Sequence, residues 1–182
     1  MYMKKIVNKI IFKIYRIIFF YSSSFIFWLP FKNIRKYYLK FFLHSMGKDV
    51  YVGRNLDVRN PFMIDIGDDV VINKHVILDG RHGLSIGNHV DIAQEACIWT
   101  RHHDYNDPKH SGIGAKTIIE DYCWICHRAI LLPGLKVSKG SVVACGAVLT
   151  KDTEPLTVVG GIPAKKIADR NNPLTYMLKD LI

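Results

Sequence analysis

Aliphatic residues recur at every sixth position over the second half of the chain. The series runs without a break through Ile119, Ile125, Leu131, Val137, Val143 and Leu149. A period of six fits neither an α-helix, which repeats about every 3.6 residues, nor a plain strand, which repeats every two. It fits a solenoid in which one short strand and its turn use six residues, and three such units close one triangular coil. The pattern therefore predicts stacked coils that bury one another's aliphatic side chains.

The six-residue period extends back to residue 52 with two shifts of register. The earlier aliphatic positions are Val52, Val58, Ile64, Ile66, Ile72, Leu78, Ile86, Ile92 and Ile98. The fourth residue after each of them is usually small or aliphatic, as at Val70, Val90 and Ala96, and turns with Asn, Asp, Lys or Gly follow. The period excludes helical bundles and doubly wound sheets. The competing architecture is a β-sandwich in which the spacing arose by chance.

The repeat stops after Ile98 and resumes at Ile119, which indicates a loop inserted near residues 101–117. A solenoid tolerates a loop at a corner, and such loops often line a binding face. The inserted loop concentrates titratable side chains, namely His102, His103, Asp104, Asp107 and His110. A neutral histidine can remove a proton near neutral pH, and a neighbouring carboxylate or carbonyl can fix its tautomer. The insertion is therefore either a catalytic element or a polar surface loop.

The formal net charge of +9 belongs to the N-terminal segment. Residues 1–48 contain no acidic residue and ten basic ones: Lys4, Lys5, Lys9, Lys13, Arg16, Lys32, Arg35, Lys36, Lys40 and Lys48. The rest of the chain has 15 basic and 16 acidic residues. The positive charge therefore characterises this segment, and the repeat itself is nearly neutral.

The basic segment has the spacing of amphipathic helices. Lys5, Lys9, Lys13 and Arg16 share one helix face, and the apolar residues between 7 and 21 share the other. The three serines at 22–24 are expected to interrupt this helix, and Pro30 to stop the apolar run. A second helix follows, whose apolar face is predicted to be Phe31, Ile34, Tyr37, Tyr38, Phe41 and Phe42 and whose charged face is Lys32, Arg35, Lys36 and Lys40.

Several roles are open to this segment. A membrane-spanning helix needs about 20 apolar residues, whereas residues 17–29 supply thirteen positions with three serines among them. A signal peptide needs a small-x-small cleavage site, which is not evident here. A basic, aromatic-rich helix in the interface of an anionic membrane fits best. The alternatives are packing on the open end of the solenoid or on a partner subunit, and nucleic-acid binding, which the continuous apolar face disfavours.

The four cysteines, Cys97, Cys123, Cys126 and Cys145, lie within or beside the repeat. A disulfide framework is not expected in a chain of this size without a clear secretory signal. A zinc site would need a second Cys/His pair besides the one C-x-x-C pair. The cysteines are therefore predicted to be small thiols of the core.

Three features of the chain resemble the hexapeptide-repeat (left-handed β-helix) acyltransferase superfamily. They are the hexads, the looped-out insertion, and the tail Gly-Gly-Ile-Pro-Ala-Lys-Lys-Ile at residues 160–167. The stretches 92–105 and 118–134 are similar to the polysaccharide and sugar O-acetyltransferases of the colanic-acid, galactoside and maltose acetyltransferase type. The resemblance covers roughly residues 50–168 and its motifs are specific.

The resemblance implies a mainly β fold, a left-handed parallel β-helix over 49–168. Outside the resemblance we expect a basic amphipathic helical segment at 1–48 that associates with membranes and a helical tail at 169–182. The resemblance also implies a homotrimer with acetyl-CoA as co-substrate in a cleft between subunits, and no metal. It implies transfer of the acetyl group to a hydroxyl of a saccharide or lipid-linked glycan in cell-surface polysaccharide biosynthesis. With the basic segment, the expected location is cytoplasmic, at the inner face of the cell membrane.

The family motifs also imply residue roles. His103, which stands before Asp-Tyr, matches the catalytic histidine that accepts the hydroxyl proton, and His102 is the runner-up. The acceptor-binding candidates are Asn73, Asp79, Arg81 and Trp124. Arg81 stands where the galactoside-type enzymes have an acidic ligand, which implies a different, acidic or larger, acceptor. The candidates for contact with coenzyme A are His127, Cys145, Thr150, Lys151, Lys165 and Lys166.

Three other functions compete with O-acetyl transfer. An N-acetyltransferase would act on the nitrogen of an amino sugar. A γ-carbonic-anhydrase-like metalloenzyme would need three histidines from neighbouring coils and subunits, for which the candidates are His75, His82, His89, His102, His103 and His110. A non-enzymatic membrane scaffold would use only the trimeric prism.

Overall fold

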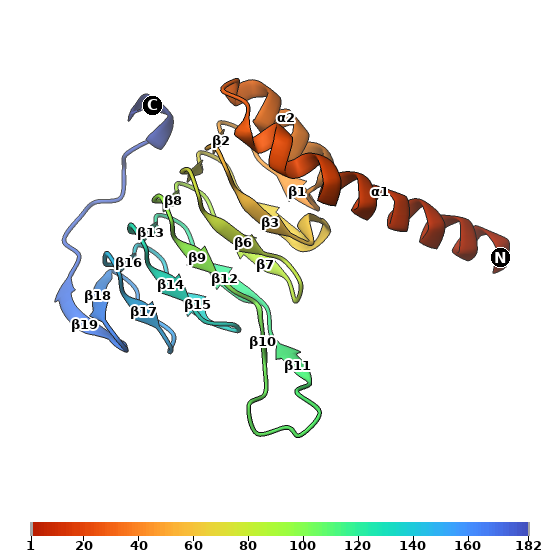
Figure 1. Ribbon diagram of the computed structural model, residues 1–182. Coiled ribbons are helices and arrows are strands. Elements are labelled where there is room, and N and C mark those ends of the chain that lie inside the picture. The colour runs from red at the N-terminus through yellow and green to blue at the C-terminus, as the bar shows by residue number, and fades with distance from the viewer. Residues whose placement is uncertain (1, 182) are drawn as a thin grey trace.

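The chain folds into two N-terminal helices and a β-solenoid of about six turns (Figure 1). The computed structural model describes the backbone of residues 2–181 and the side chains of residues 13–180. The helices are α1 (Tyr2–Trp28) and α2 (Lys32–Phe42). Short 3-10 helices lie at η1 (Pro61–Met63) and η2 (Leu178–Leu181).

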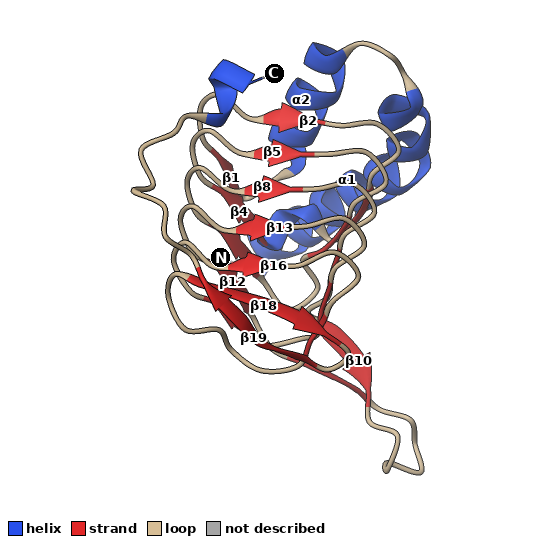
Figure 2. Ribbon diagram, turned by 90° about the vertical axis from the view of Figure 1, so that its left-hand side faces the viewer, coloured by secondary structure: helices blue, strands red, loops and turns tan. Residues whose placement is uncertain are grey.

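The solenoid has three walls, each of them a parallel sheet that takes one strand from every full coil. Sheet A consists of β1 (Ser45–Met46), β4 (Ile64–Ile66), β7 (Leu84–Ile86), β12 (Thr117–Ile119) and β15 (Lys136–Val137). Sheet B consists of β2 (Tyr51–Val52), β5 (Val71–Ile72), β8 (Asp91–Ile92), β13 (Trp124–Ile125), β16 (Val142–Val143), β18 (Thr157–Gly161) and the antiparallel β19 (Ala164–Asp169). Sheet C consists of β3 (Asp57–Arg59), β6 (Ile77–Asp79), β9 (Cys97–Ile98), β14 (Ile130–Leu131) and β17 (Val148–Leu149). Figure 2 shows sheet B face on.

The six-residue aliphatic series forms the inside of the solenoid, as the sequence predicts. All six residues from Ile119 to Leu149 are at most 2% exposed. They also stack on their equivalents in neighbouring coils, so that Ile125 pairs with Ile92 on one side and with Val143 on the other. Each coil thus covers the apolar faces of the coils beside it, which is the hydrophobic contribution that holds a solenoid together.

The register shifts of the repeat come from longer strands in sheet A. In β4 and β7 the first and last residues both face the core, as Ile64 and Ile66 and as Leu84 and Ile86. Ile64 pairs with Leu84, and Ile66 pairs with Ile86. The additional residues therefore lengthen one wall without displacing the coils from one another.

The two helices close the N-terminal end of the solenoid and share its core. Phe19, Phe27, Leu39 and Phe42 are at most 5% exposed and belong to the same cluster of buried residues as the aliphatic ladder. The serines at 22–24 do not interrupt α1, contrary to the prediction. The hydroxyl of Ser22 donates to the carbonyl oxygen of Ile18 at 2.6 Å and also contacts the Tyr38 hydroxyl, so the polar side chain is satisfied within the helix.

The buried face of α2 differs from the predicted one. Arg35, expected on the charged outer face, is only 2% exposed and points toward the first coil. Its guanidinium donates to the carbonyl oxygens of Val52 at 3.0 Å and Leu29 at 2.6 Å. Burial lowers the pKa of Arg35 because the charged form loses its hydration. Arg35 therefore ties together the α1–α2 connection and the start of the solenoid, a contact that helical periodicity does not reveal.

Several residues of the predicted apolar helix faces lie at the surface. Phe31, Tyr37 and Phe41 are 60–67% exposed, and on α1 Phe25 and Trp28 are 57–62% exposed. Lys5 and Lys9, assigned to the charged face of the first helix, lie outside the described side chains. Within the described residues, neither helix is long and apolar enough to cross a bilayer. The helices thus combine a packed inner face with an outer face rich in aromatic residues.

The C-terminal segment is not the helix predicted over 169–182. β19 extends to Asp169, and only η2 is helical beyond it. The segment runs back along the solenoid toward the helical end, as Figure 1 shows. Asp69 accepts hydrogen bonds from the backbone N–H groups of Leu178 and Lys179, both at 2.7 Å. The tail is therefore a strap across several coils.

The cysteines largely follow the prediction of core thiols. Cys123 and Cys126 are buried, Cys97 is half-buried and Cys145 is exposed, and all four are free. Burial raises the pKa values of Cys123 and Cys126 to about 12. These two thiols are therefore inert packing groups near neutral pH.

Asp91 lies on β8 and belongs to the row of outward-facing residues of sheet B. It lies between Val71 and Trp124 on the adjacent strands. Burial by these neighbours raises its pKa to about 6. The Asn73 side-chain N–H donates to it at 3.3 Å. The folded chain therefore holds a proton on Asp91 at a pH where the unfolded chain has lost it.

We predict that Arg35→Ala destabilises the fold by about 2–4 kcal/mol. The substitution leaves one buried and one partly buried carbonyl oxygen without a donor, and each loss in a buried position costs about 1–3 kcal/mol. Denaturant unfolding followed by circular dichroism measures the change. Lys40→Ala, at an exposed site on the same helix, is the control and should change stability by less than about 0.5 kcal/mol. Equal effects of the two substitutions would contradict the role of Arg35.

We also predict a pH-dependent gain in stability from Asp91→Asn. Because the folded pKa lies near 6, above that of an exposed Asp near 4, the group opposes folding increasingly as pH rises from about 4 to 6. Removing its charge should raise the melting temperature at pH 8 and have little effect at pH 4. Thermal unfolding of both proteins across this range measures the difference, and a difference independent of pH would refute the assignment.

Candidate active site

The insertion forms a β-hairpin that projects from the corner between sheets C and A (Figure 1). Its strands are β10 (Arg101–His103) and β11 (Gly112–Gly114), which pair antiparallel so that His103 lies opposite Gly112. β9 precedes the hairpin and β12 follows it, and both strands keep their places in the stacked coils. The rigid solenoid therefore fixes the base of the hairpin.

His103 is the best-oriented titratable group on the hairpin. Its Nδ1 atom lies 2.7 Å from the carbonyl oxygen of His110, and its ring stacks on the His110 ring at a centroid distance of 4.1 Å. A carbonyl oxygen can only accept, so Nδ1 of a neutral His103 carries the proton and Nε2 keeps its lone pair. The side chain is exposed. The arrangement suits a base that takes a proton from a bound molecule.

The hairpin turn holds the carbonyl group that orients His103. The Asp107 carboxylate accepts hydrogen bonds from the backbone N–H groups of Lys109 at 2.9 Å and Ser111 at 3.0 Å. Hydrogen bonds from Ser111 and Lys109 lower the pKa of Asp107, so the carboxylate is charged near neutral pH. His110 has a left-handed backbone with φ of 50°. Asp107 and His110 thus position His103, a role visible in the sequence only as an aspartate beginning a turn.

His102 differs from His103 in its surroundings. Neighbouring residues of a strand point to opposite faces, so His102 cannot share the contact with His110. It is exposed, and no hydrogen bond to its ring occurs among the described residues. The geometry of a single chain thus favours His103 over its neighbour.

The base of the hairpin rests on a buried carboxylate. Asp79 is fully buried and accepts hydrogen bonds from the Arg81 side chain at 2.8 and 3.1 Å and from the Thr100 backbone N–H at 3.0 Å. Burial opposes ionisation of Asp79, but these donors outweigh it and lower the pKa. Because its oxygens face partners within the chain, Asp79 orients Arg81 and is not itself placed to contact an acceptor.

The other acceptor candidates lie at a different edge. Asn73 follows β5 at the corner between sheets B and C, and its side chain also donates to the Ile92 carbonyl oxygen at 3.2 Å. Trp124 lies on the outer face of sheet B and is 44% exposed. The hairpin with His103 emerges from the corner between sheets C and A. Within one chain these residues are therefore not brought together.

The coenzyme A candidates are distributed over the last coils. His127 and Cys145 lie at the corner between sheets B and C, where Nδ1 of His127 is 2.9 Å from the Gln94 carbonyl oxygen. Thr150 and Lys151 are exposed after β17. Lys165 and Lys166 are exposed on β19, but Lys166 is paired with Asp169 at 2.8 Å. Lys165 has no such ion pair among the described residues.

The histidines do not form a metal centre within the described residues. His75, His82 and His89 occupy three different corners, and the remaining candidates are on the hairpin. His89 is instead 2.8 Å from Asp69 and stacks on Tyr122. No group of three His, Cys, Asp or Glu side chains converges in the part of the chain that the structure describes.

Known proteins share this fold and parts of this sequence. No protein-family model matches the chain. A protein of Escherichia coli K12 named as the colanic acid biosynthesis acetyltransferase WcaF is 25% identical over 136 residues, 75% of each chain. A Schizosaccharomyces pombe protein named as an acetyltransferase is 38% identical over 92 residues, which are 49% of this chain and 44% of that protein. The chain thus spans less than half the length of this second relative.

A solved structure extends the comparison to the whole solenoid. A hexapeptide-repeat acetyltransferase of Vibrio cholerae, determined with acetyl coenzyme A, superposes with a TM-score of 0.77 at 24% identity. The superposition covers 82% of this chain and 84% of that one, and concerns the fold. Taken with the six-residue repeat and the three-walled solenoid, it shows that the chain has the fold of the hexapeptide-repeat acetyltransferases.

Proposed function

We propose that the protein transfers an acetyl group from acetyl-CoA to a saccharide hydroxyl, with His103 as the general base. The observation that carries the proposal is the Nδ1 contact of His103 with the His110 carbonyl oxygen at 2.7 Å, on an exposed hairpin. This contact leaves Nε2 free to accept a proton. The relatives named as acetyltransferases and the neighbour bound to acetyl coenzyme A support the donor.

The chemistry needs proton transfer in both directions. A sugar hydroxyl is a poor nucleophile until it loses its proton, so Nε2 of His103 takes that proton as the oxygen attacks the thioester carbonyl. Backbone N–H groups of the solenoid or hairpin are suited to stabilise the resulting oxyanion. The imidazolium then returns the proton to the leaving thiolate. Direct transfer of this kind requires neither a covalent acyl-enzyme nor a metal.

We propose that the complete site forms between subunits of a homotrimer. His103 and the Asn73–Trp124 surface lie at different edges of one prism, so a neighbouring copy would have to supply the second wall. In this arrangement Asn73 and Trp124 contact the acceptor, and Arg81 draws an acidic group of the saccharide. Lys165 is the unpaired candidate for a phosphate of coenzyme A. His127, Cys145, Thr150 and Lys151 line the donor side.

We further propose that the protein works at the inner, cytoplasmic face of a membrane in the synthesis of a cell-surface polysaccharide. The outer faces of α1 and α2 expose Phe25, Trp28 and Tyr37 at 57–67%. These aromatic residues accompany the basic segment, as in helices that lie in an anionic interface. The likeness to WcaF, named for colanic acid biosynthesis, supports the pathway class.

We predict that His103→Ala lowers acetyl transfer at least about 100-fold, the usual scale for a general base. Thiol release from acetyl-CoA, measured across neutral, acidic and amino sugars and lipid-linked glycans, is the assay. His102→Ala is the matched control and should retain most of the activity. An inactive His102 variant with an active His103 variant would overturn the assignment. A wild-type protein without thiol release on any acceptor would favour the scaffold function.

We predict that Phe25→Ser, Trp28→Ser and Tyr37→Ser together move the protein away from membranes. These side chains are exposed, so their replacement leaves the inner core of the helices intact. Flotation with vesicles of phosphatidylglycerol and phosphatidylethanolamine measures the bound fraction, which should fall several-fold. Tyr105→Ser removes an 88% exposed aromatic side chain from the hairpin, away from the helices, and is the control. It should leave the bound fraction unchanged. Unchanged flotation of the triple variant would refute the membrane role.

A further inference from the structure

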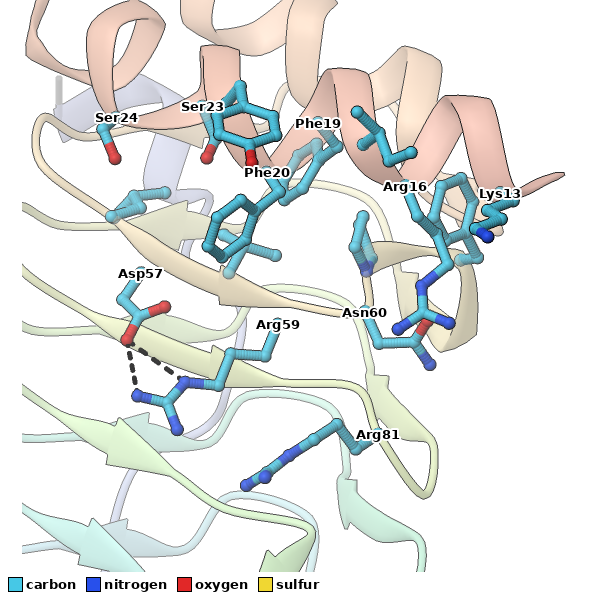
Figure 3. A pocket seen from close by; sticks show the side chains of 16 residues that line it. Lys13, Arg16, Phe19, Phe20, Ser23, Ser24, Asp57, Arg59, Asn60 and Arg81 are labelled. Atoms are coloured by element: carbon cyan, nitrogen blue, oxygen red, sulfur yellow. Dashed lines mark hydrogen bonds and ion pairs between the residues drawn. The ribbon is translucent and has the colours of Figure 1, made fainter. Parts of the chain in front are cut away.

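A large cleft separates α1 from the first coils of the solenoid (Figure 3). Its volume is about 1080 Å³, and we call it the α1 cleft. One wall is the stretch of α1 from Lys13 to Ser24, and the opposite wall is residues 56–62 with Arg81. Pockets that enclose small organic ligands are usually about 300–1,000 Å³, so this cleft is large enough for a ligand longer than a sugar ring.

The walls of the α1 cleft differ in polarity along its length. Ile17, Phe19 and Phe20 of α1 face Leu56 and Val58 of the solenoid across an apolar part. Figure 3 shows Phe19 and Phe20 descending from the helix toward the solenoid wall. Phe20 is 74% exposed. Because Phe19, Leu56 and Val58 are nearly buried, the apolar surface that this part of the cleft offers to a ligand comes from Phe20 and Ile17.

Four cationic side chains also line the cleft. Lys13 and Arg16 reach into the cleft from α1, and Arg59 and Arg81 lie on the solenoid wall. Arg59 is paired with Asp57 at 2.9 Å, and its guanidinium also lies 4.7 Å from the centre of the Trp99 ring.

Two of these four cationic side chains have no acidic partner among the described residues. Arg81 is neutralised by the buried Asp79, and Arg59 by Asp57. Neither Lys13 nor Arg16 has an ion pair among the described residues. The cleft therefore carries a cationic excess beside an apolar wall, which complements a ligand with one anionic end and one apolar end.

The cationic end of the cleft is joined to the hairpin. Arg81 is followed by His82, whose backbone N–H donates to the Thr100 hydroxyl at 3.1 Å. Thr100 precedes His103 by three residues, about 10 Å of extended strand. A saccharide that leaves the cleft past Arg81 would therefore extend along the hairpin toward His103.

We propose that the α1 cleft binds an anionic amphiphile, namely the phosphate-bearing lipid end of a lipid-linked saccharide acceptor. The proposal rests on the proposed function, since it names the class of acceptor that the same site would acetylate. The apolar wall holds the lipid chain next to the aromatic outer face of α1. Arg16 and Lys13, the two cationic side chains of the cleft without an ion pair, hold the phosphate, and the attached saccharide extends past Arg81 to the hairpin.

Isothermal titration calorimetry of the protein comprising residues 1–182 with farnesyl phosphate below its micelle concentration tests the proposal. Farnesol, which lacks the charge, and inorganic phosphate, which lacks the chain, should each bind at least about tenfold more weakly. Arg16→Glu should also weaken farnesyl phosphate binding at least about tenfold, equivalent to about 1.4 kcal/mol. Phe20→Ser tests the apolar wall in the same way, and circular dichroism confirms that each variant is folded.

Lys48→Glu is the matched control, because Lys48 is exposed outside the α1 cleft and the substitution changes charge by the same amount. Its affinity for farnesyl phosphate should equal that of the wild-type protein. Equal binding of farnesol and farnesyl phosphate, or an equal loss in the Lys48 variant, would overturn the proposal. Calorimetry needs no turnover, whereas thiol release with soluble sugars needs no lipid. A failure of the cleft proposal is thus distinguishable from a failure of the acetyltransferase function.

Discussion

The stacking of aliphatic side chains between coils is the interaction on which the rest of the structure depends. A single coil of short strands cannot bury its own apolar face, so every coil is stable only against its neighbours. Residues such as Ile92 and Ile125 are wholly buried because coils lie on both sides of them. The first coil has no preceding neighbour, and the helices take that place with Phe27 and Leu39.

This constraint also explains where chemistry can be placed. Inward positions are committed to the core, so functional groups are confined to outer faces, corners and insertions. The hairpin carrying His103 uses a corner, because a loop there leaves β9 and β12 stacked. In this rigid support, the buried Asp79 holds the Arg81 side chain and the Thr100 backbone in place, because its carboxylate accepts hydrogen bonds from both. The fold thus supplies a stiff support, and the hairpin carries the exposed His103, which we propose as the base.

The helical end is a structural cap, and we propose that it also binds the acceptor. Arg35 and the buried aromatic residues fasten the helices to the solenoid, while the outer aromatic residues and the α1 cleft remain open. The cap, the cleft and the hairpin lie in sequence along the wall from α1 through β3 and Arg81 to Thr100. In the proposed function, a membrane-bound acceptor binds at the helices and the α1 cleft, and its saccharide reaches the hairpin along this surface.

The sequence by itself determined the solenoid, the place of its insertion and the candidate base, because a six-residue period and a broken hexad are local patterns. It could not reveal that Arg35 points inward, since helical spacing identifies faces but not what a face meets. It also could not show that the His110 carbonyl orients His103, that Asp79 is fully buried, or that a cleft lies under α1. Those features depend on contacts between distant segments, and only the packing of the helices and coils on one another decided them.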